Sequence, residues 1–156
     1  MAVPARRGAT VHRHSWSLTP PWPLDPSVER AVCDEIAPVV DALGGRPLLI
    51  GKSFGTSAAA LAADRALPAV WLTPLLTEPR VATALGRATA PFLLVGGTSD
   101  PCWDGIAARR TSRYVLEVDA DHGLVVPGPL VDTIVALGRV ITAMEAFLDA
   151  IRWPLD

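Results

Sequence analysis

Short apolar runs without polar alternation recur along the chain, and segments with helical periodicity separate them. Such runs are typical of strands that are covered by helices on both faces, as in parallel sheets. Because these runs and helices alternate with short connections, the pattern predicts an α/β fold with a parallel sheet. The four strands predicted in this way are Pro47–Ile50, Ala69–Leu72, Phe92–Val95 and Tyr114–Val118.

The segment Thr10–Trp16 has a different pattern. As a strand it would place His12, His14 and Trp16 on one face and the residues between them on the other. We therefore predict an edge strand, which brings the expected sheet to about five mostly parallel strands in a three-layer α/β/α sandwich. His12 and His14 are of a residue type that binds metals, but no third ligand accompanies them. No metal site is predicted.

Helical segments fill the intervals between the predicted strands. They are Ser27–Leu43, Phe54–Ala63, Glu78–Ala88, Pro101–Arg110 and a long segment from Pro129 to about Ile151. The long segment has an apolar stripe at alternating spacings of four and three, formed by Leu130, Ile134, Leu137, Ile141, Met144, Leu148 and Ile151. We expect this stripe to pack on the sheet. A seam between two copies of the chain is the alternative interpretation.

Length and composition narrow the class of protein. At 156 residues, the chain is expected to form a single domain over residues 1–156. With 50% hydrophobic and 19% charged residues, an extended disordered chain is excluded. The formal net charge is −2 and no basic run is present, so nucleic-acid binding is not expected. No apolar run approaches the length of about 18 residues that predicts a membrane span.

Two parts of the chain lie outside the predicted elements. Residues 1–9 are interpreted as a disordered start or the remnant of a helix, and the proline-rich residues 17–26 predict a loop. The first residues also lack the apolar centre of a secretion signal. Cys33 and Cys102 have no spacing typical of a disulfide framework or a zinc site. These features predict a protein of a reducing compartment, the cytoplasm.

A serine between two glycines follows the first buried strand. The sequence Gly51-Lys-Ser53-Phe-Gly55 has the G-x-S-x-G pattern between a predicted strand and a predicted helix. In so tight a turn, a Cβ atom two residues before or after the serine would contact neighbouring backbone. The pattern therefore predicts a nucleophile elbow at Ser53. A helix N-cap at Ser53 is the alternative, whereas a phosphate-binding loop is rejected because Arg46 stands where that loop needs glycine.

A serine hydroxyl becomes a good nucleophile only when a base and an orienting carboxylate lie nearby. Asp100 follows the strand Phe92–Val95, at the sheet edge where the sites of parallel sheets collect. It also fits as the N-cap of the next helix, and Asp104 is the alternative acid. His122 follows the strand Tyr114–Val118 and is the only histidine outside the N-terminal segment. An exposed turn histidine is the alternative there.

The order serine, aspartate, histidine, each on a loop after a separate strand, resembles the α/β-hydrolase superfamily. The segments 50–56, 95–101 and 121–124 look like those of small lidless members, the dienelactone-hydrolase-like and small serine esterase branch. The resemblance extends from about residue 10 to residue 148. It implies a truncated α/β-hydrolase fold that needs no cofactor.

The resemblance also implies a role for each residue of the motifs. Ser53 would be the nucleophile, His122 the base and Asp100 its orienting acid, and the Phe54 N–H would be one oxyanion donor. In that superfamily, an earlier strand beside the nucleophile strand supplies a second oxyanion N–H. Nothing before Thr10 can supply it, so we expect a shortened fold that lacks a central strand.

The first functional interpretation is a serine hydrolase that cleaves a small ester, thioester or lactone through an acyl-enzyme. Short connections leave no room for a large lid, so an open pocket bordered by Leu75, Trp103 and Leu124 is expected. The alternative is a catalytically impaired binding or assembly module that lacks a complete oxyanion hole, and an acyltransferase is a third interpretation. A homodimer is expected, because a missing strand exposes a sheet edge and the last helix carries extra apolar surface.

Overall fold

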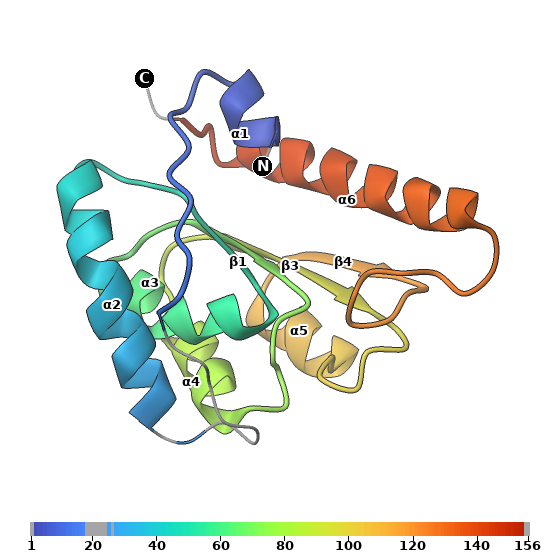
Figure 1. The fold of residues 1–156 in the computed structure, drawn as a ribbon, viewed down its shortest axis with the longest axis horizontal. Coiled ribbons are helices and arrows are strands. Elements are labelled where there is room, and N and C mark those ends of the chain that lie inside the picture. Colours follow the sequence, from blue (N-terminus) through green and yellow to red (C-terminus); the bar gives the residue numbers. More distant parts are fainter. Residues whose placement is uncertain (1, 18–24, 26, 155–156) are drawn as a thin grey trace.

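The computed structural model describes residues 2–17, 25 and 27–154 (Figure 1). Its strands are β1 (Leu49–Lys52), β2 (Ala69–Leu72), β3 (Phe92–Gly97) and β4 (Tyr114–Val118). Its helices are α1 (Ala2–Arg6), α2 (Ser27–Leu43), α3 (Ala59–Asp64), α4 (Pro79–Arg87), α5 (Gly105–Thr111) and α6 (Leu130–Ala150), and the 3-10 helix η1 (Ser53–Ala58) joins β1 to α3. The predicted α/β fold is confirmed. The predicted proline-rich loop lies mostly outside the described residues.

The strands form a four-stranded parallel sheet in the order β1-β2-β3-β4. Each strand pairs with its neighbour in the chain, and right-handed crossovers then place the connecting helices on one face of the sheet. The helices α3, α4 and α5 lie on that face together with α2, whereas α1 and α6 pack on the opposite face (Figure 1). The result is the predicted three-layer sandwich, in which β1 and β4 are the edge strands.

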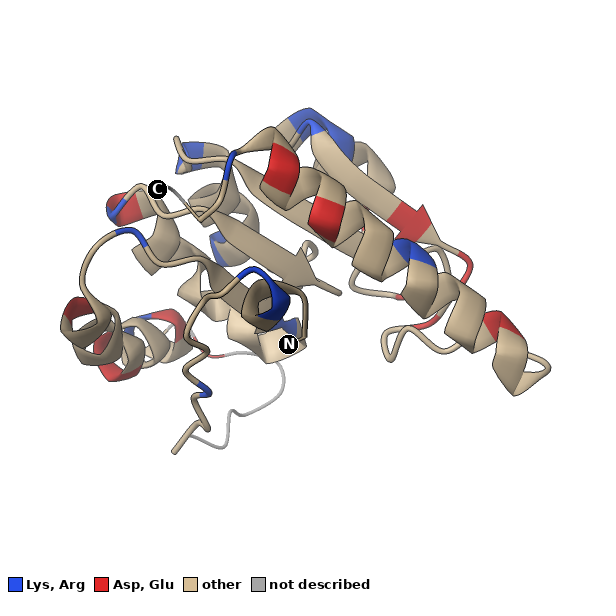
Figure 2. Ribbon diagram, turned by 90° about the horizontal axis from the view of Figure 1, so that it is seen from above, with Lys and Arg blue, Asp and Glu red and all other residues tan. Residues whose placement is uncertain are grey.

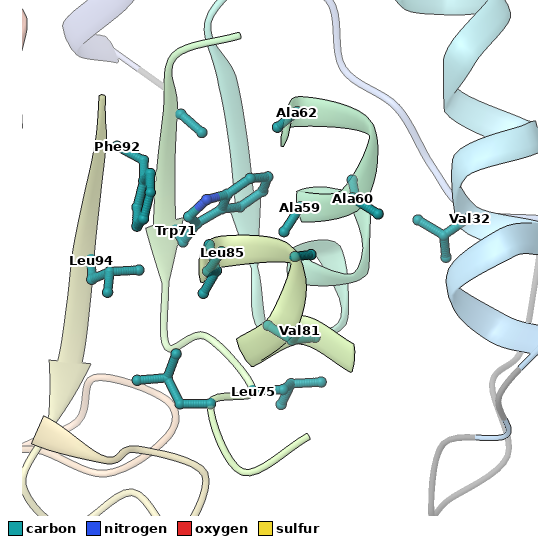
Figure 3. Packing of buried hydrophobic residues seen from close by; sticks show 14 of the residues in the cluster. Val32, Ala59, Ala60, Ala62, Trp71, Leu75, Val81, Leu85, Phe92 and Leu94 are labelled. Carbon is teal, nitrogen blue, oxygen red and sulfur yellow. The ribbon is translucent and has the colours of Figure 1, made fainter. Parts of the chain in front are cut away.

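The core on the α2 side of the sheet is centred on Trp71 of β2, which is 1% exposed. Figure 3 shows the indole of Trp71 between Phe92 of β3 and the alanines of α3. Those alanines have no side chain beyond Cβ, so α3 lies close to the sheet. On the opposite face, Val70 and Val95 pack in a second cluster with buried residues of α6.

The segment Thr10–Trp16 is not a strand, so the prediction of a fifth strand is wrong. Among the described residues, it makes no backbone hydrogen bond to β1. Within the segment, His14 contacts Glu35 of α2, with Nε2 2.9 Å from Glu35 Oε1. Ser17, the residue after the segment, donates its N–H and hydroxyl to the same carboxylate. These hydrogen bonds, those from Ser17 above all, lower the pKa of Glu35. The segment is therefore anchored to α2 at its end and pairs with none of the strands that the structure describes.

The start of the chain forms a helix, in agreement with one of the two interpretations of residues 1–9. Val3 and Pro4 of α1 are buried, and α1 packs against α6. Arg7 continues this contact with a hydrogen bond of 2.6 Å from Nη2 to Asp149 Oδ1. The two ends of the described chain are therefore tied together on one face of the sheet.

Helix α6 buries a different stripe from the one predicted. Its buried residues are Thr133, Ala136, Val140, Met144, Phe147 and Leu148. In the first turns this stripe is displaced by one residue from the predicted one, so Leu130, Ile134, Leu137 and Ile141 are 74%, 60%, 40% and 50% exposed. Small residues at 133 and 136 allow the helix to approach the sheet more closely than leucine and isoleucine would. Figure 2 shows the N-terminal turns of α6 projecting past the sheet.

Two more helix predictions need correction. The predicted helix Phe54–Ala63 is the 3-10 helix η1 followed by α3, and the helix predicted from Pro101 begins at Gly105. The first change follows from the tight turn at Ser53, and the second from a cap at Asp104 that is described below. In the part of the chain that the structure describes, no helix has both the length and the apolar character to cross a membrane.

Candidate active site

Ser53 is at a strained turn between β1 and η1. Its φ of +50° lies in the left-handed region, which residues with a side chain rarely adopt. A Cβ atom added at Gly51 would lie 2.7 Å from Trp71 Cζ3 and 2.8 Å from the Gly55 carbonyl oxygen. The turn therefore has the geometry of the predicted elbow. Gly55 is different, because a Cβ atom there would meet nothing within 4 Å, and the steric reason expected for the second glycine is wrong.

The three residues predicted as a catalytic set lie together. His122 Nε2 is 2.6 Å from Ser53 Oγ, and His122 Nδ1 is 2.8 Å from Asp100 Oδ2. Ser53 follows β1, Asp100 follows β3 and His122 follows β4, so the carboxyl ends of three strands supply them. The Asp100 side chain is fully buried, and that of His122 is 35% exposed. The imidazole therefore bridges a buried carboxylate and a hydroxyl at the surface.

The structure separates the roles of the two aspartates. Asp100 Oδ1 accepts a hydrogen bond of 2.8 Å from the Cys102 N–H, while Oδ2 faces the imidazole. Asp104 is the N-cap of α5, since its Oδ1 accepts from the N–H groups of Ile106 and Ala107, each at 2.9 Å. The interpretation of Asp100 as the helix cap is therefore wrong, and Asp104 is not placed to bind His122.

Two contacts hold the loop that carries His122. Lys52 Nζ donates to the His122 carbonyl oxygen at 3.0 Å. Asp121 Oδ1 accepts from the N–H groups of Gly123 and Val125 at 2.8 and 2.9 Å, which closes the turn around His122. A satisfied turn limits the movement of the imidazole relative to the sheet. The G-x-S-x-G pattern includes Lys52, but its sequence position alone gives no sign of this contact.

Cys102 is a neighbour of the site that the sequence analysis did not identify. Its thiol, a carboxylate oxygen of Asp100 and a ring nitrogen of His122 all lie within 4.8 Å of one another. Burial, followed by the negative charge of Asp100, raises the pKa of the Cys102 thiol. The thiol therefore carries its proton near neutral pH. The sequence places Cys102 two residues after Asp100, which was a sign that the thiol lies near the site. The turn at residues 100–102 brings the thiol close to His122.

The residues predicted to border the substrate pocket have other environments. Leu75 and Leu124 are 2% and 4% exposed and belong to the two core clusters. Trp103 Nε1 donates to Glu117 Oε2 at 2.6 Å, and its ring covers Gly96 so closely that a Cβ atom there would lie 2.0 Å away. Leu75 and Leu124 therefore do not form the expected open border, and Trp103 is held against the sheet.

A cavity of about 750 Å³ lies beside the elbow, along the outer edge of β1. Its walls are formed by residues 9–16, by α2 and by β1 itself, and Gly51, Lys52 and Gly55 bring it next to Ser53. Trp16, Trp71 and Leu49 give it an apolar lining. Its size is within the range typical of small-molecule sites. None of the three residues predicted to border the pocket lines this cavity.

Comparisons with known proteins identify the fold. No protein-family model matches the chain, and no curated protein sequence matches it. Among solved structures, it is similar to an alpha-beta serine hydrolase homologue from Coxiella burnetii, with a TM-score of 0.55, 18% identity and coverage of 88% of this chain. It is also similar to the esterase domain of a Rhodothermus marinus protein, with a TM-score of 0.50, 16% identity and 76% coverage. This chain spans 65% of the length of each. The chain thus has an α/β-hydrolase-like fold.

Proposed function

We propose that the protein is a serine hydrolase that cleaves a small ester, thioester or lactone. The observation that carries the proposal is the unbroken set of contacts from Asp100 through His122 to Ser53, at 2.8 and 2.6 Å. A nucleophile, a base and an orienting acid in this arrangement are what acyl transfer to a serine requires. The elbow at Ser53 and the hydrolase-like fold support the same function.

The contacts suggest how the proton moves. A carboxylate only accepts hydrogen bonds, so Asp100 favours the tautomer of His122 that has its proton on Nδ1. Nε2 then has a free lone pair directed at Ser53 Oγ and takes the hydroxyl proton as Oγ attacks the substrate carbonyl carbon. The imidazolium passes that proton to the leaving oxygen or sulfur, which departs. A water molecule, deprotonated by His122, then hydrolyses the acyl-enzyme and restores Ser53.

The backbone N–H of Phe54 is the donor that we assign to the oxyanion. Phe54 directly follows the nucleophile, and this position supplies one oxyanion donor in an elbow of this kind. A donor of this kind stabilises the charge that develops on the carbonyl oxygen in the transition state. The mechanism uses only groups of the chain, so a hydrolase of this type needs no cofactor.

The cavity along β1 is the place that we propose for the acyl or alcohol part of the substrate. It reaches the elbow at Gly51 and Gly55, and its lining includes three tryptophans, Trp16, Trp71 and Trp153. An apolar group bound there would leave the carbonyl carbon close to Ser53. A small ester with one apolar substituent is the substrate that we propose for this cavity.

The test is covalent labelling by a fluorophosphonate probe, which reacts with activated serines. The wild-type chain should be labelled, and Ser53→Ala should not. Ser57→Ala is the matched control on the same turn, since Ser57 is buried and lies outside the contacts of His122. Labelling that persists in Ser53→Ala would remove Ser53 from the mechanism.

A binding or assembly module is the second candidate. The observation that favours it is the position of β1 at the edge of the sheet, because in the described residues no strand lies beyond β1 to bring a second oxyanion donor. Losing one such donor can lower the rate by about 10²–10³-fold. A folded chain that resists the probe altogether would favour this candidate over the hydrolase.

We also propose that the protein forms a homodimer in the cytoplasm. The exposed apolar residues of α6, from Leu130 to Ile141, form a surface that a second copy of the same helix would cover. Their spacing of four and three residues suits helix-to-helix packing. Cys33 and Cys102 are free thiols, as is usual for proteins of a reducing compartment.

A further inference from the structure

Three metal-binding side chains meet beside the proposed nucleophile. Donor atoms of Asp100, Cys102 and His122 lie within 4.8 Å of one another. They come from two loops, the one after β3 and the one after β4, that are joined by the contact between Asp100 Oδ2 and His122 Nδ1. A carboxylate, a thiol and an imidazole in one cluster are the three side-chain types that bind zinc.

The surroundings of the cluster suit a cation. Asp100 Oδ1 is held by the Cys102 N–H, which leaves Oδ2 as the oxygen that faces His122. The Asp100 side chain is fully buried and fixed, whereas His122 is 35% exposed and opens the cluster to solvent. Three protein ligands with one side open leave a fourth position for water, as in zinc sites that exchange ligands. To bind one cation, Asp100 Oδ2 and His122 Nδ1, now 2.8 Å apart, would have to separate to about 3.3 Å, the spacing of two ligands about 2.0 Å from a tetrahedral zinc ion.

We propose that Asp100, Cys102 and His122 form a site for a divalent cation of the Zn²⁺ type, and that the cation inhibits the proposed hydrolase reversibly. The cation would take the place of the proton between His122 Nδ1 and Asp100 Oδ2, and the Cys102 thiol would release its proton to solvent on binding. The neutral imidazole then carries its proton on Nε2. In that state His122 donates to Ser53 Oγ and has no lone pair to accept the hydroxyl proton.

Inhibition rests on the proposed function, but binding does not, so the first experiment measures binding alone. Zn²⁺ is titrated calorimetrically into Ser53→Ala, which keeps all three ligands and has no nucleophile. We expect one Zn²⁺ per chain. Adding Cys102→Ser should weaken binding by at least about tenfold, because a ligand matters at least as much as its supporting contacts. Adding Cys33→Ser instead is the matched control and should leave the affinity unchanged.

The second experiment measures fluorophosphonate labelling of the wild-type chain with and without Zn²⁺. We expect saturating Zn²⁺ to stop labelling and a chelator to restore it, whereas Cys102→Ser should need at least about tenfold more Zn²⁺ for the same inhibition. No Zn²⁺ binding to Ser53→Ala, or equal affinity after Cys102→Ser, overturns the site. Binding without any effect on labelling overturns the inhibition. A wild-type chain that is never labelled contradicts the hydrolase and leaves the binding result standing.

Discussion

Lys52 Nζ donates a hydrogen bond to the carbonyl oxygen of His122, so the residue directly before Ser53 holds the backbone of the residue whose ring faces Ser53. The contact joins the last residue of β1 to the loop after β4, and these two strands lie at opposite edges of the sheet. It fixes the main chain of His122 while Asp100 fixes its ring. Lys52, between Gly51 and Ser53, thus has a structural role in holding the loop of His122.

Replacing Lys52 with methionine should slow labelling of Ser53 by up to about tenfold, the effect of losing one hydrogen bond to a charged group at a partly exposed site. The apolar stem is kept, so the loss comes from the His122 backbone contact. The measurement is the rate of fluorophosphonate labelling. Lys52→Arg retains a donor and should recover most of the rate, and equal rates for all three chains would show that the contact has no positioning effect.

Replacing Asp100 with asparagine should reduce turnover of a small ester by about 10⁴-fold, the size of effect seen when a serine-protease triad loses its acid. The reason is that an amide in place of Oδ2 no longer favours the proton on His122 Nδ1. Ester turnover and labelling rate both measure it.

Asp104→Asn is the matched control for that variant. Asparagine caps a helix about as well as aspartate, so α5 should be unaffected and activity retained. A chain disabled by Asp104→Asn but indifferent to Asp100→Asn would move the acid role to Asp104.

Gly51→Ala should lower the free energy of unfolding by about 1–3 kcal/mol, because its Cβ atom would overlap Trp71 and the Gly55 carbonyl oxygen. Urea denaturation measures the change. Gly55→Ala has free space around the new atom and should leave stability nearly unchanged. Equal losses in the two variants would contradict the packing that we describe around the elbow.

The sequence was informative where a single pattern had a single physical solution. Helix α2 and the strands β2 and β4 have the predicted bounds, because apolar periodicity and flanking breakers agree there. Ser53, Asp100 and His122 lie together as predicted, because the strands that precede them are parallel and end at one edge of the sheet. In each case, local pattern and topology gave the same answer.

The sequence pattern was misleading where it fits more than one structure. Helix α6 is apolar on more than one side, so the most regular stripe was mistaken for the buried one, and packing selected Thr133 and Ala136 instead. Thr10–Trp16 alternates like a strand, but it pairs with none of the four described strands, and its His14 side chain contacts Glu35 of α2. Cys102 was not recognised because its contact with His122 joins two loops that are far apart in sequence. Such contacts depend on tertiary geometry that no local pattern contains.

Ile134→Glu should convert the proposed dimer into a monomer, because a charge would be buried in the apolar seam on α6. Sedimentation at micromolar concentration measures the change. Thr142→Glu, on another side of the same helix, should leave the dimer intact. A wild-type chain that sediments as a monomer would contradict the proposed homodimer.

The stability of the protein should fall in alkaline solution, partly through Cys33. Burial raises the pKa of this thiol above its ordinary value of 9.0. The unfolded chain therefore loses the thiol proton at a lower pH than the folded chain does. The stability that comes from the neutral thiol is complete below the unfolded pKa and is lost as pH rises toward the folded value.

The measurement is urea unfolding at about pH 7 and about pH 10, on either side of the ordinary thiol range. Between these two pH values, the unfolding free energy of Cys33→Ala should fall by less than that of the wild-type chain. Cys102, whose pKa is raised as well, remains in both chains and cancels in the comparison. Identical falls would show that Cys33 ionises alike in the folded and unfolded chains.

The order of the sheet has a mechanical consequence for the site. Ser53 follows one edge strand and His122 the other, so three strand spacings of about 4.8 Å, roughly 14 Å in all, separate the strands that carry the two residues. Their side chains nevertheless meet at 2.6 Å, so the segments after β1 and β4 together bridge the width of the sheet. The short distance between the two side chains therefore depends on the positions of the two outermost strands of a twisted sheet. A binding event that changed this twist would move β1 relative to β4, and would thereby change the distance between Ser53 Oγ and His122 Nε2.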